Sequence, residues 1–253
     1  MTNSCEDASV DTWRAATVPL LRRAGAAGLE VTLVRRGVHP GGGGEVQLLV
    51  PAMRGLPAPL RWTEAGLVKR VRGVAFTERV SPQASNRMVD AARQLLNALL
   101  PDVYVFTDHR AGKAAGASPG YGLQLVAEST TGCALSADAC GAQQPAGQAG
   151  QALEADTPEE LGRRVTCALL QEVQAGGCVD GSHQPMALFL AAVGPDALST
   201  VRLGRLTPQA VRLLREIKEF TGITFNLQAD GRDGTVLASC VGMGLSNTAR
   251  AVT

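Results

Sequence analysis

The sequence predicts a mixed α/β protein in which many strands pair antiparallel. Short segments rich in Val, Leu and Thr alternate along the chain with segments whose apolar residues recur at helical spacing. Two of the short segments, 122–129 and 132–137, follow each other closely enough to form a hairpin. The length of 253 residues allows a substantial buried core.

The first 70 residues predict one helix and two strands. The helix is expected over 11–24, with Asp11 as its cap. Strands over 29–34 and 45–50 enclose a glycine-rich loop, and the prolines that follow predict an irregular connection.

Residues 71–138 predict a compact β-α-β-β-β unit. A strand over 71–77 precedes a helix over 81–100, which Ser81 caps and in which Pro82 occupies the first turn. A buried strand over 102–107 and the hairpin complete the unit.

Residues 139–156 are rich in Ala, Gly and Gln and have no period, so we expect a flexible linker. The last part of the chain, 157–253, predicts helices and strands in alternation. Thr157 and Glu160 form a capping box for a helix that extends to residue 175. The further helices are expected over 184–193 and 207–220, and the strands over 199–203, 224–228 and 235–241.

Composition excludes several classes of function. The net charge of +1 gives no global attraction to nucleic acid or to a membrane, so any RNA-binding face would be local. The six cysteines contain no Cys-x-x-Cys pair, which argues against a zinc site, and we expect free thiols in a reducing compartment. No apolar run reaches the 18 residues of a membrane span, and no metal or cofactor is predicted.

The loop between the first two strands is the sharpest motif. Four consecutive glycines, Gly41, Gly42, Gly43 and Gly44, allow the backbone to approach a phosphate or a base closely. A long flexible hairpin loop is the alternative interpretation. Pro40 and the tight strand flanks favour a more defined structure.

Residues 36–46 follow the pattern Arg-Gly-x-x-Pro-x-Gly-Gly-Gly-x-Val, which resembles the signature of the RNA 3′-terminal phosphate cyclase superfamily. Further segments resemble the nucleolar, cyclase-like branch of that superfamily, and the similarity extends from Ser9 to Thr253. These segments are 71–75, 79–83, 86–90, 100–104, 107–109, 118–122, 176–180 and 240–247.

The resemblance implies a scaffold of repeated β-α-β-α-β-β units with a small inserted α/β domain. On this basis we expect residues 1–70 to be a scaffold repeat that carries the signature loop Arg36, Gly37, Pro40 and Gly41 to Gly44. Residues 71–138 would be the inserted domain, 139–156 the linker and 157–253 the C-terminal repeat. The family's first repeat is expected to be missing, which predicts poor solubility of the isolated chain.

The resemblance also implies a function. True cyclases convert an RNA 3′-phosphate into a 2′,3′-cyclic phosphate through an adenylate on a histidine that precedes the last helix. Here that place reads Leu203-Gly204-Arg205-Leu206-Thr207-Pro208 and contains no histidine. His183 is the nearest substitute, but we interpret it as a capping or core-edge residue. His109 is expected in a turn, and His39, in the glycine loop, would face a ligand.

The other functional candidates are basic. Arg202, Arg205 and Arg212 are predicted to bind RNA or a partner near one helix start, and Arg212, Arg215 and Lys218 recur on one helix face. A solvated helix face with i,i+4 ion pairs is the alternative. Arg215, Glu216 and Lys218 would cleave RNA only if Glu216 reaches a 2′-hydroxyl as general base. Lys69, Arg70, Arg72 and Arg79 form a second basic group with the same two interpretations.

Three functional hypotheses follow. In the first, the chain acts in the nucleolus on pre-rRNA for the small ribosomal subunit, without cyclase chemistry. Its expected partners are a ribosome-assembly GTPase, other components of the small-subunit processome and pre-rRNA. The second hypothesis is an ATP-dependent RNA 3′-phosphate cyclase. The third is a pre-rRNA endonuclease that uses Arg215, Glu216 and Lys218.

Overall fold

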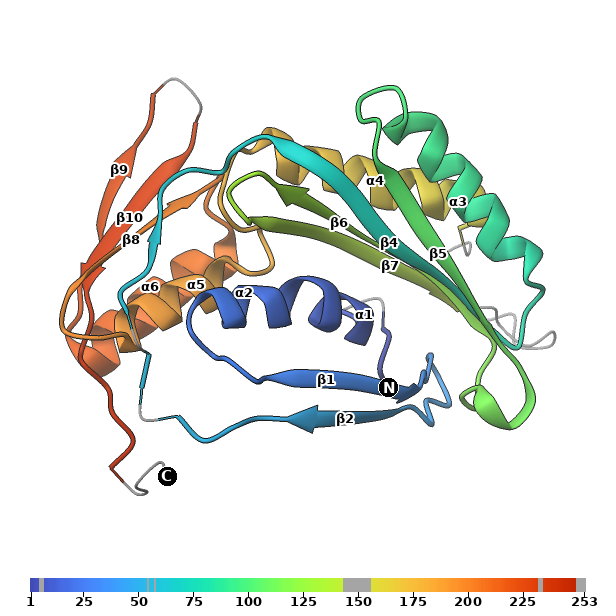
Figure 1. Ribbon diagram of the computed structural model, residues 1–253, viewed down its shortest axis with the longest axis horizontal. Helices are drawn as coiled ribbons and strands as arrows, with labels where there is room; N and C mark the ends of the chain where they lie inside the picture. The colour runs from blue at the N-terminus through green and yellow to red at the C-terminus, as the bar shows by residue number, and fades with distance from the viewer. Residues whose placement is uncertain (5–6, 54, 57, 143–155, 232–233, 249–253) are drawn as a thin grey trace.

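The computed structural model describes residues 1–4, 7–53, 55–56, 58–142, 156–231 and 234–248 (Figure 1). Its first helix is continuous from Val10 to Arg23 and consists of α1 (Val10–Thr12), η1 (Trp13–Thr17) and α2 (Val18–Arg23). This confirms the predicted helix, but Ser9 is its cap, and its side chain accepts a hydrogen bond from the amide of Thr12. Strands β1 (Glu30–Arg35) and β2 (Glu45–Leu49) follow as an antiparallel hairpin.

The second unit is a four-stranded sheet of order β5-β4-β6-β7. Its elements are β4 (Val68–Glu78), α3 (Gln83–Leu96), β5 (Val103–Arg110), η2 (Gly112–Ala114), β6 (Gly120–Ser129) and β7 (Ala134–Ala142). Strand β4 pairs parallel with β5 and antiparallel with β6, so a crossover is needed between β4 and β5, and α3 provides it. The predicted β-α-β-β-β order is confirmed.

Helix α4 (Pro158–Gln174) packs on the same face of this sheet as α3. Its side chains Leu161, Val165 and Leu169 share one core with Val71 of β4 and Met88 of α3. Gly162 lets the two helices approach closely, because a Cβ atom there would lie 2.7 Å from the carbonyl oxygen of Met88. We therefore group α4 with this sheet, whereas the expected domain limits at 138 and 157 stay a prediction.

A third unit contains α5 (Gln184–Val193), α6 (Pro208–Thr221) and a sheet of order β3-β8-β10-β9. The strands are β3 (Arg61–Trp62), β8 (Leu198–Leu203), β9 (Asn226–Ala229) and β10 (Val236–Val241). Helix α5 packs on β8 and β10, and α6 packs on α5. Leu188, Val201, Leu203 and Ala210 are central to the core between them.

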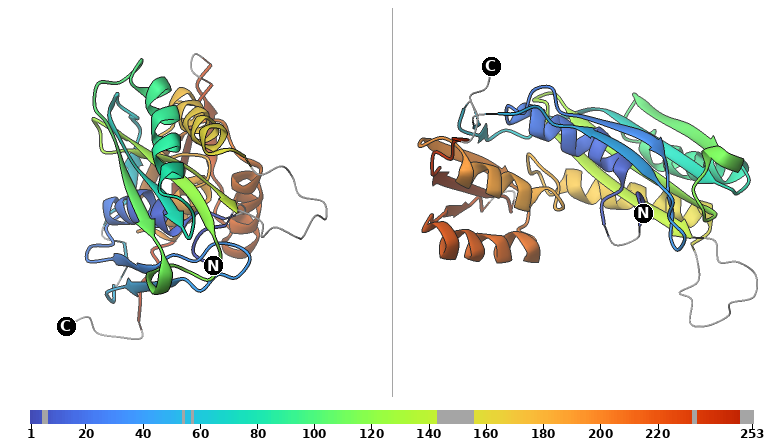
Figure 2. Two further views of the ribbon diagram at one scale, coloured as in Figure 1. Left: turned by 90° about the vertical axis from the view of Figure 1, so that its right-hand side faces the viewer. Right: turned by 90° about the horizontal axis from the view of Figure 1, so that it is seen from below.

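The first helix lies along the sheet β5-β4-β6-β7, and its hairpin β1–β2 lies on the other side of the helix from that sheet (Figures 1 and 2). The helix contacts β6 and β7 on the face of their sheet that α3 and α4 do not cover. Buried hydrogen bonds join the units: Asp180 accepts from the amide and hydroxyl of Ser136 at 2.8 Å each.

Four local predictions need correction. The helix expected over 81–100 spans Gln83–Leu96, and Pro82 rather than Ser81 is its cap. Residues 139–142 belong to β7, not to a linker, and residues 143–155 lie outside the described residues. His109 lies in β5 instead of a turn. Strand β5 is not buried as a whole, because residues on only one of its faces pack against α3.

Candidate functional site

The signature loop folds back on its own chain. The amide of Gly37 donates to Thr2 Oγ1 at 2.9 Å, and that of Gly41 donates to Ser118 Oγ at 2.7 Å. A third amide, that of Gly42, donates to the Val38 carbonyl at 2.9 Å. Three of the N–H groups that a phosphate would need therefore already have partners inside the protein. Exposed loop positions, His39 and Pro40 among them, face solvent.

Close backbone approach explains why this loop contains so many glycines. A Cβ atom on Gly37 would lie 2.3 Å from the Gly44 amide nitrogen, and one on Gly44 would lie 2.4 Å from Thr2 Cγ2. Gly42 and Gly43 have φ values of 63° and 73°, which other residues rarely adopt. The loop is thus a compact plug against residues 116–118 of the neighbouring unit.

Arg36, at the base of the loop, is a buried ion-pairing residue. Its guanidinium donates to both carboxylate oxygens of Asp11 at 2.9 Å, pairs with Asp108 and lies 5.0 Å from the ring centre of Phe76. Burial alone would lower the pKa of Arg36, but the bonds to Asp11 and Asp108 outweigh it and raise the pKa. Burial raises the pKa of the neighbouring Glu78 carboxyl.

His183 is fixed in the interior and has no free ring nitrogen. Its Nδ1 lies 2.8 Å from Asp180 Oδ1, and its Nε2 lies 2.8 Å from Thr17 Oγ1. A nucleophile for adenylation needs an accessible nitrogen, so the core-edge interpretation of His183 is confirmed. At the start of α6, Thr207 caps the helix, and its amide donates to Gln184 Oε1 at 3.0 Å.

The predicted basic residues do not form one group. Arg212, Arg215 and Lys218 are exposed on α6, as is Glu216, and the structure gives their side chains no ion pair within its described residues. Arg205 is exposed before α6. Arg202 belongs elsewhere: it lies on β8, donates to the Thr63 carbonyl at 2.7 Å and pairs with Asp230 at 3.3 Å. Arg202 therefore lies apart from Arg212, because Val201 and Leu203 take the strand face toward the helices. The binding role of Arg202 stays a prediction.

The second basic group is divided between ion pairs and loop contacts. Arg70 pairs with Glu128 at 2.7 Å, and Arg72 pairs with Asp102 at 2.8 Å. Arg79 instead donates to the carbonyls of Gly112 and Gly116. Among the described residues, no group of His, Cys, Asp and Glu side chains is placed to hold a metal ion.

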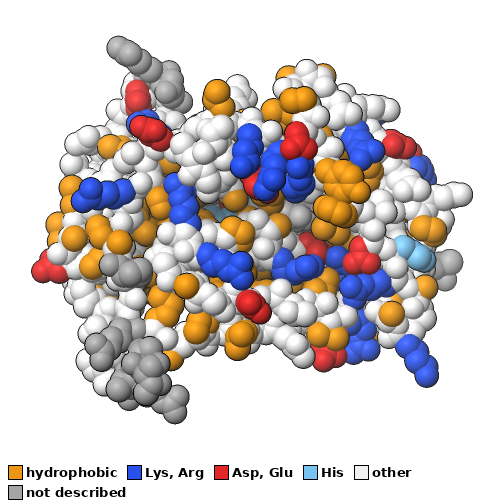
Figure 3. Space-filling view, viewed as in Figure 1, with side chains coloured by type: hydrophobic (Ala, Val, Ile, Leu, Met, Phe, Trp, Pro, Cys, Tyr) orange, Lys and Arg blue, Asp and Glu red, His pale blue; other side chains and the backbone are white. Residues whose placement is uncertain are grey.

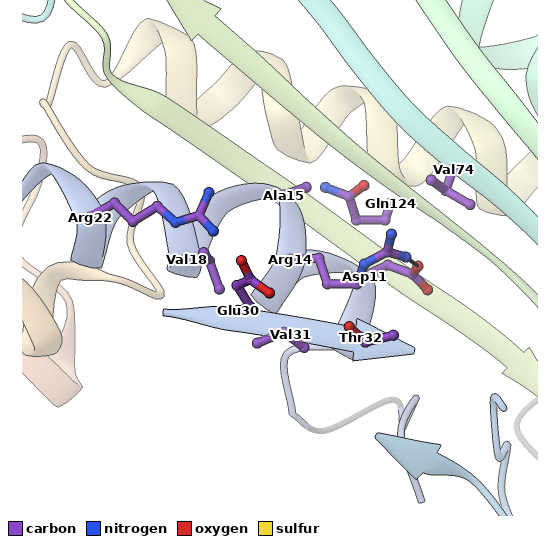
Figure 4. Close-up of a pocket in the computed structure, with 10 residues that line it drawn as sticks. All are labelled: Asp11, Arg14, Ala15, Val18, Arg22, Glu30, Val31, Thr32, Val74 and Gln124. Carbon is purple, nitrogen blue, oxygen red and sulfur yellow. Dashed lines mark ion pairs between the residues drawn. The ribbon is translucent and has the colours of Figure 1, made fainter. Parts of the chain in front are cut away.

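A pocket of about 420 Å³ lies where the first helix and β1 meet the sheet β5-β4-β6-β7 (Figure 4). The helix supplies Asp11, Arg14, Ala15, Val18 and Arg22, β1 supplies Glu30, Val31 and Thr32, and the sheet supplies Val74 and Gln124. Gln124 is 1% exposed, and its amide nitrogen has no hydrogen-bond partner among the residues that the structure describes. On the space-filling surface, Lys and Arg side chains gather across this part of the molecule (Figure 3).

Comparison with known proteins agrees with the motifs. Residues 63–174 match the family of RNA 3′-terminal phosphate cyclase insert domains. The chain is 44% identical over 259 residues to the RNA 3′-terminal phosphate cyclase-like protein of Homo sapiens. The aligned region covers 99% of this chain and 67% of that protein. A cyclase-like relative in Dictyostelium discoideum is 41% identical over 256 residues, 99% of this chain and 68% of the relative. The chain belongs to the RNA 3′-terminal phosphate cyclase-like family.

The rRNA processing protein rcl1 of Schizosaccharomyces pombe is another relative, 38% identical over 256 residues. The insert-domain match includes α4, in agreement with the packing of that helix on the sheet β5-β4-β6-β7, which we call the insert sheet. For this member of the cyclase-like family, the structure describes no helix long and apolar enough to cross a membrane.

Sequence reasoning missed the pocket and the exposed aromatic residues of the insert sheet. Tyr104 and Phe106 are 48% and 54% exposed, although their strand was expected to be buried. The segment Val103-Tyr104-Val105-Phe106 is apolar at every position, so its alternation between two faces is hidden. Gln124 carried a weak signal, as a single amide within the apolar segment 122–127.

Proposed function

We propose that this chain is a non-cyclase factor of early pre-rRNA processing for the small ribosomal subunit. It would act in the nucleolus of the nucleus, bound to a ribosome-assembly GTPase and to other components of the small-subunit processome. The observation that carries the proposal is its similarity to a fission-yeast protein described as an rRNA processing protein. The site chemistry supports it, since His183, the nearest substitute for the adenylated histidine, has both ring nitrogens bonded.

Pre-rRNA analysis tests the processing role. In cells whose own protein can be depleted, we expect precursors of the small-subunit rRNA to accumulate while large-subunit precursors mature normally. Hybridisation to the spacer on either side of the small-subunit rRNA measures this. Normal processing in cells that lack the protein would refute the proposal.

A labelling experiment tests the absence of cyclase chemistry. The purified chain is incubated with ATP labelled at the α-phosphate, and acid-labile label on the protein is measured. We expect none, because the bonds to Asp180 and Thr17 occupy both nitrogens of His183. His183→Gln serves as the control, and label that this variant lacks would restore the cyclase hypothesis.

An endonuclease is the second candidate, but the structure gives it little support. Arg215, Glu216 and Lys218 are all exposed on α6, and a general base works best in a site that excludes water. The triple alanine variant is expected to leave pre-rRNA cleavage unchanged.

A further inference from the structure

The face of the insert sheet that α3 and α4 do not cover presents an aromatic pair beside the pocket. We call it the free face, although the first helix contacts it at β6 and β7. Val71, Ala75 and Val105 point into the core formed with α3 and α4, so their neighbours in each strand point the other way. Tyr104 and Phe106 therefore lie on the free face, with their ring centres 4.5 Å apart at an angle of 73°. An edge-to-face pair of exposed rings leaves ring surface open to a further planar group.

The strand register connects this pair directly to the pocket. Phe106 is paired with Val74 on the next strand, and Val74 is paired with Gln124 on the strand after that. Because adjacent strands lie about 5 Å apart, the exposed ring, the apolar wall and the unpaired amide form one continuous row. The first helix borders this row on its far side (Figure 4).

The pocket itself has the chemistry of a site for a heterocyclic base. Ala15, Val18 and Val74 supply apolar walls for a flat group. Within the described part of the chain, the Gln124 amide is a buried donor without an acceptor, a state that costs free energy unless a ligand provides the acceptor. Glu30, on the same rim, is an acceptor for an exocyclic amino group.

Two arginines at the pocket edge suit the phosphates that accompany a base. The side chain of Arg14 is half exposed and lies 3.9 Å from Asp11, a carboxylate that Arg36 already binds with two hydrogen bonds. Arg22 is exposed and donates to the Leu29 carbonyl. Neither arginine has its charge neutralised by a close, dedicated carboxylate, so both remain attractive to an anion.

We propose that the free face of the insert sheet binds single-stranded RNA, with one unpaired base in the Gln124 pocket and a neighbouring base stacked on Tyr104 and Phe106. Arg14 and Arg22 contact the phosphates between them. Single-stranded RNA is the matching ligand because only unpaired bases can leave the stack to occupy a recess and an aromatic ring. This inference rests on the proposed function and names the surface through which an rRNA-processing protein holds its substrate.

Fluorescence anisotropy with a labelled 12-nucleotide single-stranded RNA of mixed sequence tests the proposal. The double variant Tyr104→Ala/Phe106→Ala is expected to bind about tenfold more weakly, since each stacked base contributes about that factor. Phe189→Ala, at an equally exposed ring on α5, is the matched control and is expected to bind like the parent. The parent should also prefer the single strand to a duplex of the same sequence.

Gln124→Met separates binding from folding. Methionine keeps the length of the side chain and removes an amide whose nitrogen has no partner, so the melting temperature should stay the same or rise. RNA binding should nevertheless fall several-fold. Arg14→Glu should weaken binding and its salt dependence, whereas Arg163→Glu, on α4 behind the sheet, should not.

Three binding results would overturn the inference: no RNA binding by the parent chain, unchanged binding by all the sheet-face variants, or loss of binding only in Arg212→Glu and Arg215→Glu on α6. The proposed function is judged separately. If cells that carry Tyr104→Ala/Phe106→Ala process pre-rRNA normally while the depleted cells do not, the processing role stands and this RNA surface is refuted.

Discussion

At the scale of single residues, Arg36 illustrates a motif residue whose visible role is structural. The guanidinium is 1% exposed and is held by Asp11 on the first helix and by Asp108 on β5. It therefore connects the signature loop to two separate units of the fold. A charge buried this deeply is stable only while its partners remain.

Arg36→Met should destabilise the protein strongly. The substitution leaves the carboxylate of Asp11, itself 1% exposed, buried without its cation, a loss of about 3–5 kcal/mol in the free energy of unfolding. Urea unfolding followed by circular dichroism measures the loss. Arg164→Met, which breaks an exposed pair with Asp156, is the control and should cost less than about 1 kcal/mol. Equal costs for the two variants would contradict the structural role of Arg36.

At the scale of elements, the sequence predicted α4 and the β6–β7 hairpin better than it predicted the structure of the signature loop. The capping box of α4 and the hairpin of β6 and β7 follow from local signals, and both were predicted correctly. The loop's fold depends on residues that lie far away in the sequence, Thr2 and Ser118. Its glycine pattern indicated close approach, but it did not identify the approaching group, which is the protein's own backbone.

Gly37→Ala tests how tightly this loop is closed. The new Cβ would meet the Gly44 amide nitrogen at 2.3 Å and the Gly42 carbonyl carbon at 2.7 Å, and backbone atoms cannot rotate away. We expect a loss of about 3 kcal/mol in the free energy of unfolding. Gly112→Ala, at a left-handed position with open space around it, should cost only about 1 kcal/mol. If the protein tolerated Gly37→Ala better than Gly112→Ala, the loop would not be closed tightly against its own backbone.

At the scale of the whole molecule, Asp180 lies where the three units meet. It accepts from Ser136 on β7 and from His183 at the start of α5, and His183 in turn contacts Thr17 of the first helix. Burial would by itself raise the pKa of Asp180, but hydrogen bonds from His183, Ser182 and Ser136 lower it to about 2. The charged carboxylate therefore stabilises the assembled units.

The pH dependence of stability follows from the sign of this shift. An unfolded aspartate has a pKa of about 3.9, above the folded value, so the stabilisation is complete above about pH 4 and is lost as the pH falls toward about 2. Asp180→Asn should cost about 2 kcal/mol at pH 7, and the difference from the parent should shrink as the pH falls below 4.

Urea unfolding of the parent and of Asp180→Asn between pH 3 and pH 7 measures this difference. Asp90→Asn, at an exposed carboxylate on α3, is the control and should change stability by less than about 0.5 kcal/mol. A difference between the parent and Asp180→Asn that grows as the pH falls would contradict the assignment.

The sequence by itself determined the order of the α-helices and of the described strands other than the short β3, the mixed α/β class and the family, because these depend on local periodicity, capping and contiguous motifs. Only the tertiary structure decided that Arg202 lies apart from the α6 stripe, that α4 shares the core of the insert sheet, and that Phe106, Val74 and Gln124 form one row. Strand pairing, burial and ion pairing join residues far apart in the sequence, and their strength depends on the surroundings that folding creates. The candidate RNA surface belongs to this second group, since its residues come from four strands and a helix that meet only in the folded protein.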